Sequence, residues 1–281
     1  MHTDSVLCLN SQGFHRMVYH QWGSDDNERV LVCVHGLARN SRDFDELAKS
    51  LARDYRVICP DIVGRGSSDW LPTGSPYGLP QYLNDMTTLL ARLNVEQVDW
   101  LGTSMGGIIG ICLAAQPNSP IRSLVLNDIG SFIPANALQR ISSYLGHKEF
   151  STLAEVEQYM KSHYLALKNL NELQWQHLVR QGVRPLESGG YALHYDPAIA
   201  QATAAMADQD VDLMPFWRAI QCPQALIWGE ASDVLTADTV TQMQALNSDM
   251  ALLGLPGICH APSLMEADQI RWVQHWLRHH Q

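Results

Sequence analysis

The chain has 281 residues, of which 46% are hydrophobic and 17% are charged, and its formal net charge is −10. This composition is typical of a globular protein with a sizeable apolar core, and it excludes an intrinsically disordered chain. The acidic balance and the lack of any run of lysine or arginine argue against a nucleic-acid partner.

The N-terminal segment and the cysteines predict a cytoplasmic protein. The segment M-H-T-D-S-V-L-C-L-N lacks a basic start followed by a long apolar run. We therefore expect no signal peptide, no membrane span and no stable membrane anchoring. The six cysteines are scattered and form no C-x-x-C pair, so no disulfide framework is predicted. The oligomeric state stays open.

The first half of the chain alternates short apolar strands with amphipathic helices, which is typical of a parallel sheet covered on both faces. The alternation predicts strands at residues 14–22, 29–35, 55–60, 97–102 and 123–127. Apolar residues at helical spacing predict helices at residues 43–52, 79–93 and 105–115. A short strand at residues 6–9 is expected to form a hairpin with the strand at residues 14–22.

The pattern changes to helices alone after Gly130. Strand signals return only at residues 225–228 and 250–253, and an amphipathic helix at residues 265–279 closes the chain. We therefore predict a core formed by residues 1–130 and 212–281, with a helical insertion at residues 131–211 lying on it like a lid.

Ser104 is the predicted nucleophile, because V-D-W-L-G-T-S-M-G-G places it between two glycines, after a strand and before a helix. A chain that breaks from strand to helix at one residue strains that residue's backbone. Gly102 and Gly106 would remove the side chains that collide in such a turn. The turn would lift the serine hydroxyl out of the sheet edge and point the Met105 N–H into the same space.

A serine nucleophile needs a general base, and that base needs a third group to hold its ring. Of the twelve histidines, His260 is the best candidate, since it closely follows the strand at residues 250–253. Loops after parallel strands gather at one sheet edge, which is where Ser104 would emerge.

Asp233 is the preferred acid, because it follows the strand at residues 225–228 and completes the chain order Ser104, Asp233, His260. Asp128, which ends the preceding strand, is the alternative acid, since a carboxylate one strand over can reach the same imidazole. Glu230 is a weaker third candidate.

Two backbone donors are needed for the oxyanion of acyl transfer, and we predict the N–H groups of Met105 and Leu37. Leu37 lies in V-H-G-L-A-R-N, where Gly36 lets the backbone turn after a strand. His35 is interpreted as a hydrogen-bonded brace of this loop rather than as a base.

Together, V-H-G-L, D-I-V-G-R-G-S-S-D, G-T-S-M-G-G, W-G-E-A-S-D and G-I-C-H resemble the signatures of the α/β-hydrolase superfamily, in its lipase, esterase and cofactor-free haloperoxidase-like branch. The resemblance implies a mostly parallel eight-stranded sheet flanked by helices, with a helical cap insertion. Arg65, in the second motif, is interpreted as mainly structural, with contact to the substrate as the alternative. Dehalogenases and epoxide hydrolases of this fold use aspartate as the nucleophile, so the serine at position 104 disfavours those two reactions.

Carbon–carbon hydrolases of this fold usually carry Gly-Pro-Gly where this chain has Leu37-Ala38-Arg39, and a tryptophan where it has Ala261. These differences weaken the prediction of carbon–carbon bond cleavage.

We therefore expect a serine hydrolase that cleaves small carboxylic esters with an apolar acyl or alcohol part, through an acyl-enzyme. The alternatives are a lactonase, thioesterase or carbon–carbon hydrolase with the same triad, or a ligand-binding homologue with low turnover. Neither a cofactor nor a metal is expected. His275 and His279 have metal-ligand spacing, but a solvated helix face is the preferred interpretation.

Overall fold

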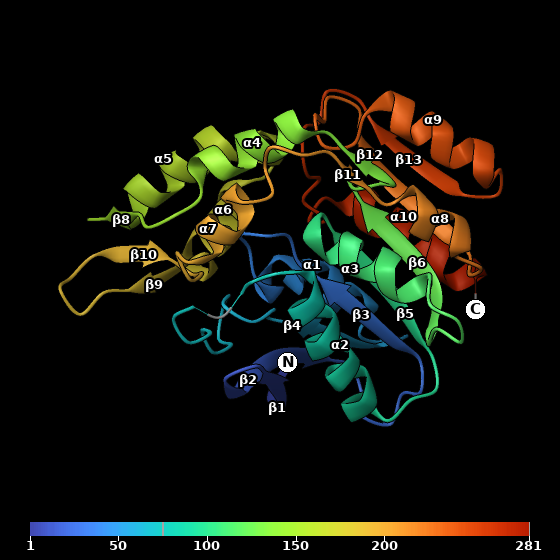
Figure 1. Cartoon of the computed structure of the whole chain (residues 1–281), viewed down its shortest axis with the longest axis horizontal. Helices are drawn as coiled ribbons and strands as arrows, with labels where there is room; N and C mark the ends of the chain where they lie inside the picture. The colour runs from blue at the N-terminus through green and yellow to red at the C-terminus, as the bar shows by residue number, and fades with distance from the viewer. Residues whose placement is uncertain (75, 281) are drawn as a thin grey trace.

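An eight-stranded sheet organises the chain in the computed structural model, which describes residues 1–74 and 76–280 (Figure 1). The spatial order of its strands is β1 (His2–Asn10), β2 (Gly13–Trp22), β4 (Arg56–Pro60), β3 (Val30–Val34), β5 (Val98–Thr103), β6 (Ile121–Asn127), β12 (Gln224–Gly229) and β13 (Ala251–Leu255). Strands β1 and β2 form an antiparallel hairpin, and β2 pairs antiparallel with β4. All other pairings are parallel. The predicted mostly parallel α/β-hydrolase sheet is confirmed.

Helices cover both faces of this sheet, so the central strand β3 is apolar along its whole length. All five residues of β3 are buried, as expected for a strand covered on both sides. Successive residues point to opposite faces: Trp100 of β5 belongs to one core cluster and Leu101 to the other. The helices of this core are η1 (Ser41–Phe44), α1 (Asp45–Leu51), α2 (Leu79–Leu93), α3 (Met105–Ala114), α8 (Met214–Ala219), α9 (Ala237–Leu246) and α10 (Ala267–His279).

Each core cluster lies against a different set of helices. Leu89 of α2 and Ile109 of α3 pack with Trp100, whereas Leu47 of α1 and Trp276 of α10 pack with Leu101. Among the residues that the structure describes, no helix is long and apolar enough to cross a membrane.

An inserted segment follows β6 and precedes α8. It begins with β7 (Phe132–Ile133) and ends with β11 (Val211–Asp212), and these two strands pair with each other. Between them lie α4 (Ala135–Tyr144), α5 (Leu153–His163), η2 (Leu165–Leu167), α6 (Glu172–Gln181) and α7 (Ile199–Ala204). In Figure 1 this inserted segment, coloured from green to gold, lies along the upper left of the molecule.

The inserted segment is not helical throughout, which corrects the expectation of helices alone. A small antiparallel sheet joins β8 (Glu149–Phe150), β10 (Tyr191–Leu193) and β9 (Val183–Pro185). Its strands are two or three residues long, which is too short for a period-two hydrophobic pattern to appear in the sequence.

Candidate active site

Ser104 occupies a sharp turn between β5 and α3, with backbone angles φ 51° and ψ −115°. Few residues other than glycine adopt such angles. A side-chain Cβ at Gly102 would lie 2.3 Å from the Gly106 carbonyl carbon, and one at Gly106 would lie 2.0 Å from the Val34 oxygen. The two glycines therefore make room for the turn, which holds the serine at the carboxyl edge of the sheet.

His260 connects Ser104 to a buried carboxylate. Its Nε2 lies 2.9 Å from Ser104 Oγ, and its Nδ1 lies 2.7 Å from Oδ2 of Asp128. A carboxylate accepts, so Nδ1 carries the proton and Nε2 is left to accept the serine hydroxyl. Asp128 is fully buried, and its Oδ1 accepts the Gly229 N–H at 2.7 Å. The imidazole therefore has the orientation and tautomer that proton removal from Ser104 requires.

Asp233, the preferred acid in the sequence analysis, is bound elsewhere. Its carboxylate binds the guanidinium of Arg140 on α4, with 2.7 Å between Oδ1 and Nη2, and its side chain is 41% exposed. The preference for Asp233 over Asp128 is corrected: Asp128 is the carboxylate bonded to His260. Glu230 is exposed and lies over Gly254.

The physical reason for this correction is strand order. Asp128 directly follows β6, which is hydrogen-bonded to β5, the strand that carries Ser104. Strand β12 lies one position farther from β5, and Asp233 comes only after a further turn beyond its end. Both loops leave the same edge of the sheet, so chain order alone does not separate the two acids.

The loop after β3 presents a free backbone donor at Ser104. Neither the Leu37 N–H nor the Met105 N–H donates a hydrogen bond to any residue that the structure describes, and both residues line a cavity at Ser104. The Gly36 carbonyl, in the same peptide group as the Leu37 N–H, accepts a 2.7 Å hydrogen bond from His35 Nδ1. His35 thus orients this peptide group.

His35 is a neutral, buried brace. Its Nε2 accepts the Ile62 N–H at 3.0 Å while its Nδ1 donates to Gly36, so one nitrogen donates and the other accepts. Burial lowers the pKa of His35 to about 4. These contacts agree with the interpretation of His35 as a residue that supports the loop, with neither nitrogen available to a substrate.

Asn127 is a site residue that the sequence analysis missed. Its backbone oxygen accepts the Ser104 N–H at 3.1 Å, and its side-chain Nδ2 donates to Thr103 Oγ1 at 3.0 Å and to the Pro262 oxygen at 2.9 Å. Asn127 thus ties the serine turn to the histidine loop. The available signal was a polar residue that ends an otherwise apolar strand.

Two cavities meet at Ser104 and share Leu37 and Ile141. The first contains His260 and is lined on its other sides by Arg39, Tyr144 and Tyr164 among others. The second lacks His260, and most of its lining is apolar, including Leu79, Ile108, Ile133, Leu138, Val211 and Leu213. The serine therefore lies between a partly polar space and an apolar one.

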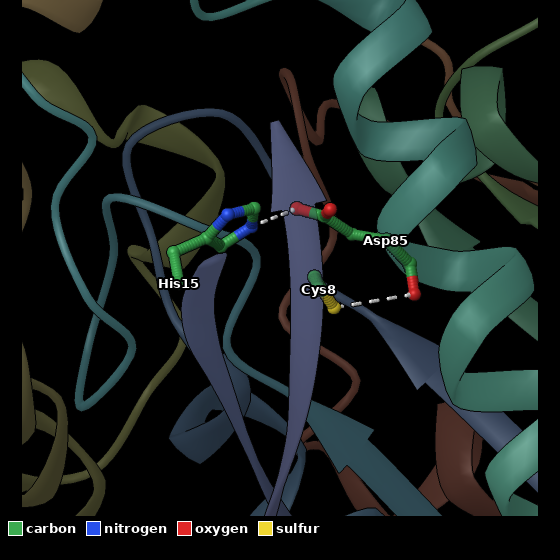
Figure 2. Close-up of side chains that lie close together, drawn as sticks. All are labelled: Cys8, His15 and Asp85. Carbon is green, nitrogen blue, oxygen red and sulfur yellow. Dashed lines mark hydrogen bonds and ion pairs between the residues drawn. The ribbon is translucent and has the colours of Figure 1, made fainter. Parts of the chain in front are cut away.

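A second group of reactive side chains lies where the β1–β2 hairpin packs on α2 (Figure 2). His15 Nε2 lies 2.9 Å from Oδ2 of Asp85, and the Cys8 thiol lies 3.9 Å from the Asp85 backbone oxygen. Metal binding would need a thiolate, but burial raises the pKa of Cys8 to about 12. Because the carboxylate is already shared by His15 and Gln81, we interpret the group as a clamp between hairpin and helix.

The chain belongs to the alpha/beta hydrolase fold family, whose model matches residues 29–266. It is 42% identical to the 3-hydroxybutyrate-oligomer hydrolase of Cupriavidus necator in an alignment of 274 positions that covers 94% of each chain. It is also 26% identical to the 2-(acetamidomethylene)succinate hydrolase of Mesorhizobium japonicum, over 82% of this chain and 81% of that protein. A solved alpha/beta hydrolase from Novosphingobium aromaticivorans superposes with a TM-score of 0.88 at 32% identity, over 98% of each chain. The protein is a hydrolase of this family.

Proposed function

We propose that this hydrolase cleaves carboxylic esters through an acyl-enzyme formed on Ser104. The observation that carries the proposal is the hydrogen-bonded line from Ser104 Oγ through His260 to Asp128. Such a line activates a hydroxyl that is otherwise a weak nucleophile at neutral pH. The free N–H groups of Leu37 and Met105 are the proposed donors to the oxyanion.

In the first half of the reaction, Ser104 Oγ attacks the ester carbonyl carbon while His260 Nε2 takes the hydroxyl proton. The carbonyl electron pair moves to oxygen and returns as the carbon–oxygen bond to the alcohol breaks. His260 then gives its proton to the departing alkoxide. Water attacks the acyl-enzyme in the same way, with Nε2 as base, and releases the carboxylic acid and free Ser104.

Because the leaving group must be protonated, each part of the ester can be assigned to one of the two cavities. The departing oxygen must come within reach of His260 Nε2, so the alcohol part of the ester occupies the cavity that contains His260. The acyl part then occupies the apolar cavity beside Met105 and Ile108. Ile141 of α4 borders both cavities, which supports the inserted segment as a cap that selects substrates.

The proposed substrates are short linear esters of hydroxy acids, the class named for the relative from Cupriavidus necator. When the terminal ester of such an oligomer is cleaved, the departing alcohol carries a carboxylate. The proposed alcohol cavity contains a cationic side chain, Arg39, whose guanidinium lies 5.5 Å from the centre of the Tyr164 ring. Asp43, which lines the same cavity, binds its Nε at 2.9 Å and its Nη2 at 2.5 Å. This ion pair holds the guanidinium at the cavity wall, and the remaining N–H groups of Arg39 are the proposed donors to the carboxylate.

Two measurements test the proposal. A fluorophosphonate probe should label the wild-type protein at Ser104, and Ser104→Ala should abolish labelling and ester hydrolysis. Ser50→Ala is the matched control, since the Ser50 hydroxyl donates to Leu47 within α1. Turnover should be compared on 3-hydroxybutyrate dimer and trimer, p-nitrophenyl esters, thioesters, lactones and a dione substrate for carbon–carbon cleavage.

Each failure has its own meaning. Activity retained by Ser104→Ala would contradict the mechanism. Labelling with no turnover on any substrate would instead favour a ligand-binding protein that keeps the triad. Faster turnover of thioesters, lactones or the dione than of linear esters would show that a different bond is cleaved. The assignment of Ser104 as the nucleophile would stand.

A further inference from the structure

Arg65 is a guanidinium buried without an anionic partner. It is fully buried in the loop after β4. Among the residues that the structure describes, no carboxylate lies within ion-pair distance of it. A buried charge without a counter-ion is costly, because the protein interior solvates it less well than water does. Arg65 is therefore expected to serve a purpose beyond packing.

The guanidinium of Arg65 contacts other atoms of the two residues whose N–H groups are the proposed oxyanion donors. Its Nε donates to the Leu37 oxygen at 2.9 Å, and its Nη2 lies 3.6 Å from the Met105 sulfur. Its Nη1 donates to the Val63 oxygen at 2.8 Å and to the Tyr82 hydroxyl at 3.0 Å. All of these partners are neutral. The rings of Tyr82 and Tyr77, whose centres lie 5.0 and 5.8 Å from the guanidinium carbon, attract the cation but carry no counter-charge.

We infer that Arg65 is a positioning residue that prepares the oxyanion hole, an inference that rests on the proposed ester hydrolysis. It acts through Leu37, whose carbonyl it holds and whose N–H faces the site, and through its contact with Met105. Its guanidinium contacts both residues that carry the donors, so its positive charge also stabilises negative charge on the carbonyl oxygen. Both effects grow as the tetrahedral intermediate forms and are small while the neutral ester is bound.

The motif D-I-V-G-R-G-S-S-D is consistent with this placement, because it turns tightly on both sides of Arg65. Gly64 and Gly66 have φ of 83° and 53°, and a Cβ at Gly66 would lie 2.3 Å from the Asp61 carboxylate. Asp61 accepts the N–H groups of Ser41 and Ser67 and so fixes the loop. The backbone around Arg65 is thus fastened independently of the guanidinium, and a side-chain replacement there is a fair test.

The test compares Arg65→Met, which keeps an unbranched apolar side chain, with Arg65→Lys, which keeps the charge. Arg65→Met should lower kcat about 100-fold, the usual loss for one oxyanion donor, with KM within about threefold. Arg65→Lys should lie between Arg65→Met and the wild type. Titration of Ser104 with a fluorophosphonate gives the folded, competent fraction, by which each kcat is divided.

A second readout separates this role from a structural one. An aryl boronic acid forms a tetrahedral anion on an active serine, whereas the product alcohol places no anionic oxygen in the oxyanion hole. Arg65→Met should weaken boronate binding by about the factor lost from kcat and leave product binding within about threefold. Equal losses in boronate and product binding, or a kcat within threefold of wild type, would overturn the inference.

Arg65→Lys tests the contribution of charge. A kcat as low as that of Arg65→Met would refute this part of the inference. Failure of the ester-hydrolase proposal has a different signature: in the wild-type protein, Ser104 is not labelled or esters are not hydrolysed.

Discussion

The carboxylate of Asp128 accepts a 2.7 Å hydrogen bond from His260 Nδ1, although the two residues are 132 positions apart in the chain. Asp128 has a φ of 53°, a left-handed conformation that aspartate tolerates better than most residues. Its second oxygen binds the Gly229 N–H at the end of β12. One buried carboxylate thus joins the ends of two neighbouring strands to the histidine loop.

Because His260 is bonded to Asp128, an aspartate-to-asparagine change should lower kcat far more at Asp128 than at Asp233. Asp128→Asn should lower kcat about 10⁴-fold, because an amide favours the wrong imidazole tautomer and does not stabilise the imidazolium. Asp233→Asn breaks an exposed ion pair with Arg140 and should leave kcat within about fivefold. Steady-state kinetics on a p-nitrophenyl ester measure both. A larger loss from Asp233→Asn would contradict the structure-based choice of acid.

The substrate proposal predicts that Arg39 recognises the carboxylate of the departing hydroxy acid. Arg39→Gln should raise KM for the free acid of 3-hydroxybutyrate dimer about tenfold or more, because a charge-assisted hydrogen bond is lost. KM for the methyl ester of the same dimer should change little.

Arg42→Gln is the matched control for Arg39, since Arg42 binds Asp45 in the adjoining turn and lines neither cavity. Equal effects of Arg39→Gln on the acid and on its methyl ester would refute carboxylate recognition.

Acid sensitivity of the fold should depend on His35. Its pKa is lowered from 6.5 to about 4 by burial, so between these values the unfolded chain binds more protons than the folded one. The free energy of unfolding should therefore fall as the pH drops through this window, by up to about 3 kcal/mol from this group.

His35→Gln, which keeps a donor and an acceptor, should show a flatter pH dependence. Urea unfolding at several values between pH 7 and pH 4.5 measures the difference between the variant and the wild type. Parallel pH curves for the two proteins would argue against His35 as the source.

The clamp at the hairpin should affect stability without affecting catalysis. His15→Ala removes one of the two side chains that bind the buried Asp85 carboxylate and leaves only Gln81. It should lower the free energy of unfolding by about 3 kcal/mol. The kcat of the folded variant should equal that of the wild type. His147→Ala removes an exposed pair with Glu149 and should barely change the melting temperature. A fall in kcat after His15→Ala, measured where the protein is folded, would contradict a purely structural role.

The fold was predicted from hydrophobic patterns within short stretches of the sequence. Alternating apolar strands and helices identified the central parallel sheet, because a strand buried on both faces needs apolar residues throughout, as in β3. The very short strands β8, β9 and β10 escaped prediction, because two or three residues give no readable period. Their pairing depends on contacts between distant parts of the inserted segment.

The sequence did not predict the roles of residues that act through contacts with distant parts of the chain. Arg65 was interpreted from its motif as mainly structural, and nothing in the neighbouring residues indicates that its guanidinium reaches Leu37 and Met105. Asn127 was interpreted simply as the end of a strand, yet it binds Thr103 at the end of β5, Ser104 in the serine turn and Pro262 in the histidine loop.

The sequence by itself determined the turn at Ser104, since the clash that Gly102 avoids is with Gly106, only a few positions along the chain. The clash that Gly106 avoids is with Val34 of β3, a contact that only the tertiary structure shows. The sequence also determined that the serine, histidine and acid loops leave the same edge of the sheet, because parallel strands end there. Only the tertiary structure decided which carboxylate meets His260. That choice depends on the lateral order of β5, β6 and β12 and on Arg140, which binds Asp233, and neither is encoded in a local pattern.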